Sequence, residues 1–175
     1  MRRSALVMAS VVATVLTAFA SRALSDDLPE YRLKAAFLYN FAVFTDWPAA
    51  VGPTLNVCVY GRDPFGSEID PLQGKGVGDR RIALHRVMGV ESLKDCQVVF
   101  VADSARGELP RVLASLHDAA VLTVADVPGA AAQGVILNMN VANNRVTFEV
   151  NLAAARGANL QLSSKLLRLA TDVRQ

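Results

Sequence analysis

Short apolar runs rich in valine recur along the chain and constrain its fold more than any other feature. Three of them are Leu55–Tyr60, Gln97–Ala102 and Ala120–Ala125, and a fourth segment, Arg80–Val87, alternates apolar and polar residues. Runs of this length are typical of strands, and continuous apolar runs are typical of strands that are buried on both faces. Turns or helical stretches separate the four segments, so β and α elements alternate. The pattern predicts a mainly parallel sheet that is covered by helices on both faces.

The pattern changes in the last third of the chain. Two extended segments, Gly134–Val141 and Arg145–Val150, flank Asn143 and Asn144, a pair that is typical of a tight antiparallel hairpin. Helical segments are predicted at 103–117, 152–157 and 160–170. We therefore expect an α/β fold in one compact domain, residues 28–172, with an about six-stranded, mainly parallel sheet and a C-terminal antiparallel hairpin.

The segment Tyr31–Pro48 predicts a long helix with much of the aromatic core. Its sequence is YRLKAAFLYNFAVFTDWP, and apolar residues follow the helical spacing i, i+3, i+4, i+7. The expected apolar face consists of Leu33, Ala36, Phe37, Asn40, Phe41 and Phe44. Asn40 would then need a buried hydrogen-bond partner. Pro48 disfavours a helical residue before it, so the helix should end there. We interpret this face as a core face, with contact to a partner protein as the alternative.

The first twenty residues have the pattern of a secretory signal peptide. Arg2 and Arg3 form a basic start, residues 5–20 are largely apolar and uncharged, and Ala18–Ala20 has the small-x-small cleavage pattern. This run is too short for a stable membrane anchor, although a retained anchor is the alternative. We therefore expect export to the periplasm, cleavage after Ala20, a mature chain of about 155 residues and no stable membrane insertion.

The net positive charge of the chain comes from this signal peptide, which is called the leader below. Removing Arg2 and Arg3 from the 18 basic residues leaves 16, against 16 acidic residues. Nucleic-acid binders carry dense basic patches, so the sequence does not indicate that class. The remaining charge is uneven, because residues 128–175 contain five basic and two acidic side chains. Lys165 and Arg168 in this basic part are the candidate partner-binding residues.

The two cysteines, Cys58 and Cys96, both follow the leader. In an oxidising compartment an even number of cysteines favours a disulfide, and a pair of buried free thiols is the alternative. Neither His85 nor His117 has the spacing of a metal ligand, so we expect no metal and no other cofactor. The sequence also lacks a Gly-x-Ser-x-Gly elbow, a His-Glu-x-x-His motif and a paired-carboxylate signature. We therefore do not expect an enzyme.

One turn could hold a small ligand. The sequence GRDPFG at 61–66 follows a predicted strand, at the end of which α/β folds often bind anions. It lacks the lysine and the spacing of a phosphate-binding loop, so a tight strand-to-helix turn is the first interpretation. Gly61, Arg62 and Asp63, together with Asn151, are the residues that we expect to line a small-ligand cleft if one exists.

Six segments of the chain, taken in order, carry a resemblance to a known family. They are KAAFLYNFAVFTDWP at 34–48, VCVYGRDPFG at 57–66, GKGV at 74–77, CQVVFVA at 96–102, FEVNLAAA at 148–155 and LQLSSKLLRLA at 160–170. Together they cover nearly all of the chain after the leader. In this combination they resemble the YfiR family of periplasmic signalling proteins.

The resemblance implies a small α/β periplasmic domain that is commonly dimeric and has no catalytic activity. It implies that the protein restrains an inner-membrane diguanylate cyclase by binding its periplasmic sensory part. Release of that restraint would raise cyclic-di-GMP and favour biofilm. The resemblance also pairs Cys58 with Cys96, and a second disulfide is excluded because no other cysteine is present. A periplasmic module that binds or senses a small ligand, such as a solute or a nucleotide, is the alternative.

Overall fold

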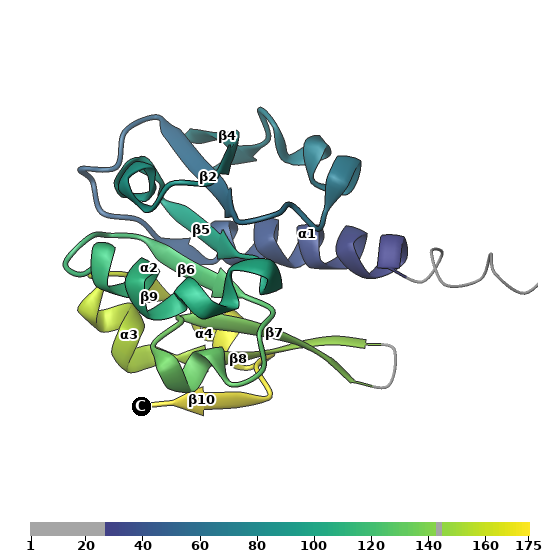
Figure 1. Ribbon diagram of the computed structural model, residues 1–175. Coiled ribbons are helices and arrows are strands. Elements are labelled where there is room, and N and C mark those ends of the chain that lie inside the picture. The colour runs from purple at the N-terminus through teal and green to yellow at the C-terminus, as the bar shows by residue number, and fades with distance from the viewer. Residues whose placement is uncertain (1–26, 143–144) are drawn as a thin grey trace, which may run out of the picture.

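A mixed sheet crosses the domain in the computed structural model, which describes residues 27–142 and 145–175 (Figure 1). Among these residues the sheet has eight strands in the order β10-β8-β7-β6-β5-β2-β4-β3. Their bounds are β2 (Thr54–Tyr60), β3 (Gly76–Val77), β4 (Arg80–Val87), β5 (Val98–Val101), β6 (Leu122–Ala125), β7 (Leu137–Ala142), β8 (Arg145–Asn151) and β10 (Asp172–Arg174). A separate antiparallel pair joins β1 (Thr45–Asp46) to β9 (Gln161–Leu162). The predicted signal peptide, residues 1–20, and the Asn143–Asn144 turn lie outside the described residues.

The directions of the strands agree with the prediction. β4, β2, β5, β6 and β7 form a parallel set, β8 runs antiparallel to β7, and β10 pairs in parallel with β8. β5 and β6 are buried along their whole length, as continuous apolar runs predict. The α/β fold, the mainly parallel sheet and the C-terminal hairpin are therefore confirmed. The sequence did not predict β3 and β10, which form the two edges of the sheet.

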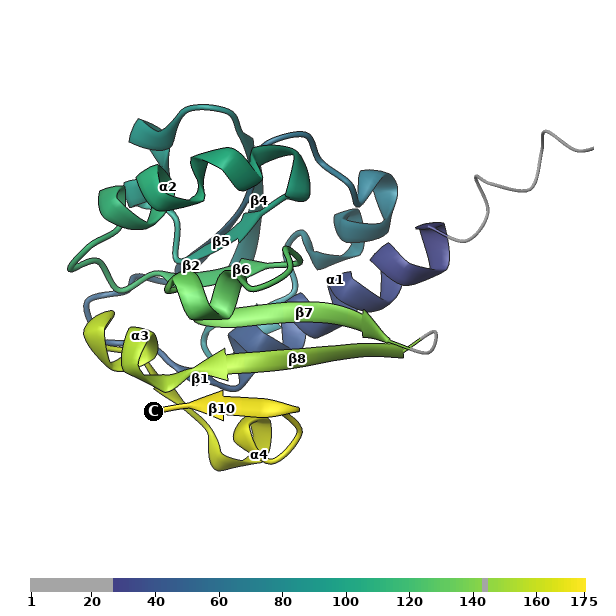
Figure 2. The ribbon, with the colours of Figure 1, turned by 60° about the horizontal axis from the view of Figure 1, so that its bottom comes forward.

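Helices cover both faces of the sheet (Figures 1 and 2). One face carries α1 (Asp27–Val43), the 3₁₀ helix η1 (Gly66–Leu72) and α4 (Ser164–Leu167). The other carries the 3₁₀ helices η2 (Val90–Asp95) and η3 (Asp103–Glu108), and α2 (Leu109–Ser115). The 3₁₀ helix η4 (Ala130–Gln133) precedes β7, and α3 (Leu152–Gly157) follows β8. Each face has its own core, with Phe41, Phe100 and Phe148 in the first and Leu109 and Val112 in the second.

α1 buries a different face from the one predicted. Lys34, Leu38 and Phe41 are buried, whereas Leu33 and Asn40 are exposed. Apolar residues occupy most of the circumference of this helix, so their spacing alone does not select the side that packs on the sheet. Asn40 therefore needs no buried hydrogen-bond partner, and that expectation is wrong.

The predicted helix at 160–170 is divided between β9, α4 and the turn before β10. Ser163 separates the first two elements. Its N–H donates to the Phe44 carbonyl over 2.9 Å, and its hydroxyl accepts from the Leu166 N–H over 3.3 Å at the start of α4. The serine thus ends the extended segment and begins a new, short helix.

Within residues 27–142 and 145–175, no helix combines the length and the apolar character that a membrane crossing requires. The long helix α1 has 17 residues and carries Lys34 and several other polar side chains.

Candidate functional site

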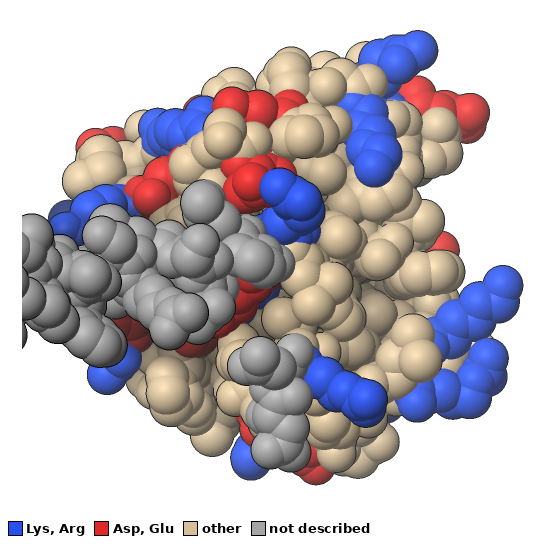
Figure 3. Space-filling model, turned by 90° about the vertical axis from the view of Figure 1, so that its right-hand side faces the viewer, with Lys and Arg blue, Asp and Glu red and all other residues tan. Residues whose placement is uncertain are grey.

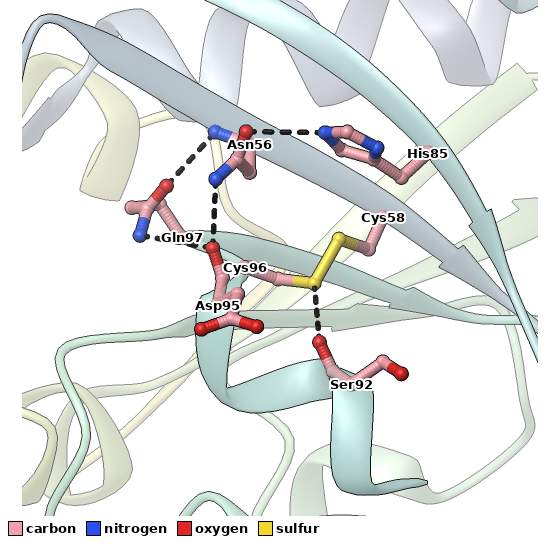
Figure 4. Close-up of a disulfide and its surroundings, with 7 residues drawn as sticks. All are labelled: Asn56, Cys58, His85, Ser92, Asp95, Cys96 and Gln97. Atoms are coloured by element: carbon pink, nitrogen blue, oxygen red, sulfur yellow. Dashed lines mark hydrogen bonds between the residues drawn. A yellow bond between two sulfur atoms is a disulfide. The ribbon is translucent and has the colours of Figure 1, made fainter. Parts of the chain in front are cut away.

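Cys58 and Cys96 form a disulfide that joins the sheet to η2 (Figure 4). Cys58 lies on β2, and Cys96 directly follows η2. Their Cα atoms are 6.0 Å apart, and both residues are buried. The predicted disulfide is therefore confirmed, and the alternative of two buried free thiols is wrong.

Asn56 organises the polar groups beside this disulfide (Figure 4). Its Nδ2 donates to the Asp95 carbonyl over 2.8 Å, and its Oδ1 lies 3.1 Å from Nε2 of His85. An amide oxygen only accepts hydrogen bonds, so this contact assigns the hydrogen to Nε2 of His85. When His85 is neutral, its other ring nitrogen, Nδ1, is therefore an acceptor.

A groove of about 480 Å³ opens over the disulfide. Strand β4 contributes His85 and Val87 to its lining, and η2 contributes Ser92 and Asp95. Neither the Ser92 hydroxyl nor the Asp95 carboxylate makes a hydrogen bond to another described residue. A groove of this size, with a few polar atoms beside an apolar floor, has the general character of a small-molecule site.

The predicted ligand turn begins directly after β2, and several of its polar groups have partners within the protein. The Arg62 N–H donates to Ser104 Oγ over 2.9 Å, and Arg86 Nε donates to Asp63 Oδ2 over 2.7 Å. The hydrogen bond to Asp63 is the main cause that raises the pKa of Arg86 above its ordinary value. Gly61 has a φ of +93°, and a Cβ there would lie only 3.0 Å from Ser104 Oγ. These contacts hold the start of the turn against Ser104 and Arg86.

Asn151 lies on β8, separated from this turn by the strands β5, β6 and β7. Its Oδ1 accepts from the Ala154 N–H over 2.8 Å at the start of α3, and its Nδ2 donates to the Ala131 carbonyl over 2.8 Å. Both groups of the side chain thus hold the local chain in place. The structure does not bring Asn151 together with Gly61, Arg62 and Asp63 in one cleft.

Tyr60 is a buried titratable group at the end of β2. Its hydroxyl donates to Glu108 Oε2 over 2.7 Å. Burial, followed by this hydrogen bond, raises the pKa of Tyr60 to about 12. The phenol is therefore protonated at neutral pH and links β2 to η3. In the part of the chain that the structure describes, no group of three or more His, Cys, Asp or Glu side chains is arranged to hold a metal ion.

A buried ion pair, which the sequence analysis did not predict, fastens α1 to the sheet. Lys34 Nζ lies 2.7 Å from Asp126 Oδ2, and the two side chains are 5% and 2% exposed. Glu30 places a second carboxylate oxygen 2.5 Å from Nζ. The Tyr31 hydroxyl donates to the same Asp126 oxygen over 3.0 Å. The sequence signal that could have indicated this ion pair is a lysine four residues after a glutamate, within a largely apolar segment.

Apolar side chains gather where the start of α1 meets the β7–β8 hairpin. We call this set the hairpin patch; it consists of Leu33, Phe37, Val141, Val146 and Leu169. Leu33 lies one turn before Phe37, whose ring centroid is 5.9 Å from that of Phe148. Val141 and Val146 are paired on the same face of the hairpin as Phe148. Leu169 is close in sequence to Thr171, whose N–H donates to the Phe148 carbonyl.

Three members of the hairpin patch are strongly exposed for apolar residues. The exposed fractions are 44% for Leu33, 48% for Val141 and 68% for Leu169. Figure 3 shows the side of the molecule on which the hairpin and the start of α1 lie. Its centre is an uncharged, hollowed area, with charged side chains of both signs around it. Exposed apolar area with a polar margin is typical of a protein-binding surface.

The predicted partner-binding residues are close in sequence to Leu169 of the hairpin patch. Lys165 lies in α4, and Arg168 directly precedes Leu169. Arg145 begins β8, one residue before Val146. All three basic side chains are exposed, and none of them forms an ion pair with a described residue. Their charge therefore favours an approaching surface with acidic groups.

The chain is a small α/β domain with an exposed apolar surface, the hairpin patch. Residues 31–171 match the model of the YfiR/HmsC-like family (DUF4154), and the chain belongs to this family. Its members are periplasmic regulators of signalling. The resemblance inferred from the six sequence segments is therefore confirmed.

Comparison with solved structures supports the fold alone. The chain is similar to an ABC domain from Streptococcus pneumonia in complex with L-Trp, at 7% identity and a TM-score of 0.53. It is also similar to a conserved domain protein from Vibrio cholerae O1 biovar El Tor, at 6% identity and a TM-score of 0.51. Each match covers 82% of this chain but only 60% of the other. No curated protein matches the sequence.

Proposed function

We propose that this protein is a non-catalytic periplasmic repressor of a membrane diguanylate cyclase. It binds the periplasmic sensory region of the cyclase, holds the enzyme inactive, and so lowers cyclic-di-GMP and biofilm formation. Membership of the YfiR/HmsC-like family supports a regulatory role in the periplasm. The observation that carries the binding role is the hairpin patch, with its exposed apolar side chains.

The proposed contact needs no catalytic group. A regulator shifts the equilibrium of its partner only if it binds the inactive arrangement more tightly than the active one. Moving a two-state partner from almost fully active to almost fully inactive takes about 5.5 kcal/mol of such a difference. Burial of a few large apolar side chains can supply this amount, at roughly 1.5–3 kcal/mol for each. Lys165, Arg168 and Arg145 would orient the partner through charge.

Replacing Leu169 with aspartate should weaken binding to the periplasmic part of the cyclase at least tenfold. The change places a charge at the most exposed position of the hairpin patch. Met88→Asp is the matched control, because Met88 is 76% exposed and follows β4, away from the patch. Binding to the purified periplasmic region is measured by calorimetry. Equal affinities of both variants and the unaltered protein would contradict this use of the patch.

A small-ligand sensor is the second candidate function, and the groove over the disulfide favours it. The free Ser92 hydroxyl, the Asp95 carboxylate and His85 Nδ1 could hold a polar compound there. A ligand that binds only the folded protein raises its melting temperature by mass action. A screen of nucleotides, amino acids and sugars by melting temperature separates the two candidate functions. A ligand-dependent rise in melting temperature that the His85→Ala substitution abolishes supports the sensor. A screen without any shift removes this function.

A further inference from the structure

Strand β4 has an outer edge that is only partly covered. The short strand β3 pairs with Arg80 and Arg81 at the start of β4. Farther along, the Leu84 N–H donates over 2.8 Å to Oε1 of Gln73, a side chain that takes the place of a strand. Beyond this point, no strand in the described part of the chain pairs with the outer side of β4. The last part of β4, near the top of Figure 1, is therefore an open edge of the sheet.

The direction of each backbone group on this edge follows from the pairing of β4 with β2. The Val87 carbonyl accepts from the Gly61 N–H and therefore points toward β2. In a planar trans peptide the N–H points opposite to the preceding carbonyl, so the Met88 N–H points away from β2. By the same alternation, the Arg86 N–H and the carbonyls of Leu84 and Arg86 point outward. None of these groups has a hydrogen-bond partner among the described residues, so the edge offers donors and acceptors to an added strand.

The groove over the disulfide lies beside this edge, on one face of the sheet. His85 is the register partner of Cys58, and both residues line the groove. The Arg86 side chain points to the other face, because side chains alternate along a strand, and there it binds Asp63 and Asp70. An added strand would place every second side chain in the groove, next to His85.

The free polar groups of the groove all accept hydrogen bonds. Asp95 is the one acidic residue in the lining, and its carboxylate has no partner among the described residues. The Ser92 hydroxyl and Nδ1 of neutral His85 can accept as well, and Figure 4 shows Ser92 and Asp95 across the disulfide from His85. A lysine ammonium has three donors and no acceptor, so it complements this set in both charge and hydrogen bonding.

We propose that the open edge of β4 binds an extended segment of another protein by strand addition, with a lysine side chain of that segment in the groove. The backbone groups of β4 hold the segment, and the Asp95 carboxylate selects its charge. This inference is independent of the proposed repression, because the hairpin patch lies on α1, β7, β8 and the segment after α4. It also differs from the small-ligand sensor, which needs no backbone group of β4.

A short peptide of alternating lysine and valine, blocked at both ends, is the probe. Its counterpart with glutamate in place of lysine should bind at least tenfold more weakly in calorimetry, and Asp95→Asn should remove most of this preference. Hydrogen exchange, followed by NMR for each amide, detects the added strand directly. With the lysine peptide bound, the Arg86 and Met88 amides should exchange at least tenfold more slowly. The His85 amide, which points toward β2, should change little.

Two substitutions at Arg86 separate the backbone contact from the side chain. Arg86→Pro removes the outward N–H, and an edge strand tolerates proline where the N–H faces solvent. Arg86→Met is the matched control, because it loses the same ion pairs with Asp63 and Asp70 but keeps the N–H. The proline variant should bind the lysine peptide at least tenfold more weakly than the methionine variant.

The exchange measurement uses the unaltered protein and decides the proposal even if the proline variant is unstable. The proposal is overturned if the lysine peptide does not bind, or if it binds without slowing exchange at Arg86 and Met88. Equal binding by two folded Arg86 variants would overturn it as well. Slower exchange at these amides with rising protein concentration, in the absence of peptide, would assign the edge to a second copy of the chain and also contradict the proposal.

Discussion

Replacing Lys34 with methionine should lower the free energy of unfolding by about 3–5 kcal/mol. The substitution keeps the length of the side chain but leaves the Asp126 carboxylate buried without a cation, and an uncompensated buried charge costs about this much. Glu30 loses its partner too, but it is more exposed and can be solvated. Urea denaturation followed by circular dichroism gives the difference directly.

Two further variants identify the cause of this loss. The double variant Lys34→Met with Asp126→Leu should recover most of the stability, because replacing a buried ion pair with apolar residues is often neutral. Arg32→Met is the matched control: it removes an ion pair from the same helix with the same 2.7 Å separation, but its side chain is 75% exposed. It should leave the stability almost unchanged. A Lys34→Met variant as stable as the control would show that the buried pair does not fasten α1.

Removing the disulfide with Cys58→Ser and Cys96→Ser together should cost about 4 kcal/mol in the chain-entropy model for a separation of 38 residues. For a domain of this size the melting temperature should fall by roughly 10 °C. Both positions are buried, so two hydroxyl groups add a small further cost. Differential scanning calorimetry measures the effect, and the unaltered protein under reducing conditions provides an independent comparison.

Binding to the proposed cyclase partner gives the control for this variant. The disulfide joins β2 to the residue after η2, whereas the hairpin patch lies on α1, β7, β8 and the segment after α4. Below its melting temperature, the double serine variant should therefore bind the partner with nearly unchanged affinity. Labelling of two free thiols in the native, unreduced protein, or an unchanged melting temperature, would contradict a stabilising disulfide.

The sequence predicted the central sheet well because each central strand carries its own signal. β5 and β6 are buried on both faces, and this environment requires the continuous valine-rich runs that are visible without a structure. β10 has no such signal. Its residues Asp172, Val173 and Arg174 are half-buried or exposed, and the strand exists through its pairing with β8, more than twenty residues earlier in the chain.

The packing of α1 also depends on a contact with a residue that is distant in the sequence. Lys34 is buried because Asp126, 92 residues later, supplies its counter-charge, and no local spacing contains that information. The predicted face of the helix was therefore wrong, although the helix itself was expected. Its correct orientation also decides that Leu33 is exposed rather than buried.

Some of the candidate sites could be predicted from the sequence, whereas others exist only in the folded protein. Cys58 and Cys96 could be paired from the cysteine count and the expected compartment. Lys165 and Arg168, chosen from the basic end of the chain, stay a prediction. The hairpin patch combines residues of α1, β7, β8 and the segment after α4, so it exists only in the folded protein. The contacts of the Gly61 turn with Ser104 and Arg86 could not be seen in the sequence, and the use of this turn as a ligand site stays a prediction.

Cellular cyclic-di-GMP in a strain that lacks the gene tests the proposed repression most directly. Deletion should raise the concentration, and the exported protein should return it to the original level. A form without residues 1–20 should fail to do so, because it stays in the cytoplasm. Exported Leu169→Asp should also fail, while exported Met88→Asp should succeed, with both variants present at equal amounts in the periplasm. An unchanged concentration after deletion, or rescue by the cytoplasmic form, would contradict repression through a periplasmic contact.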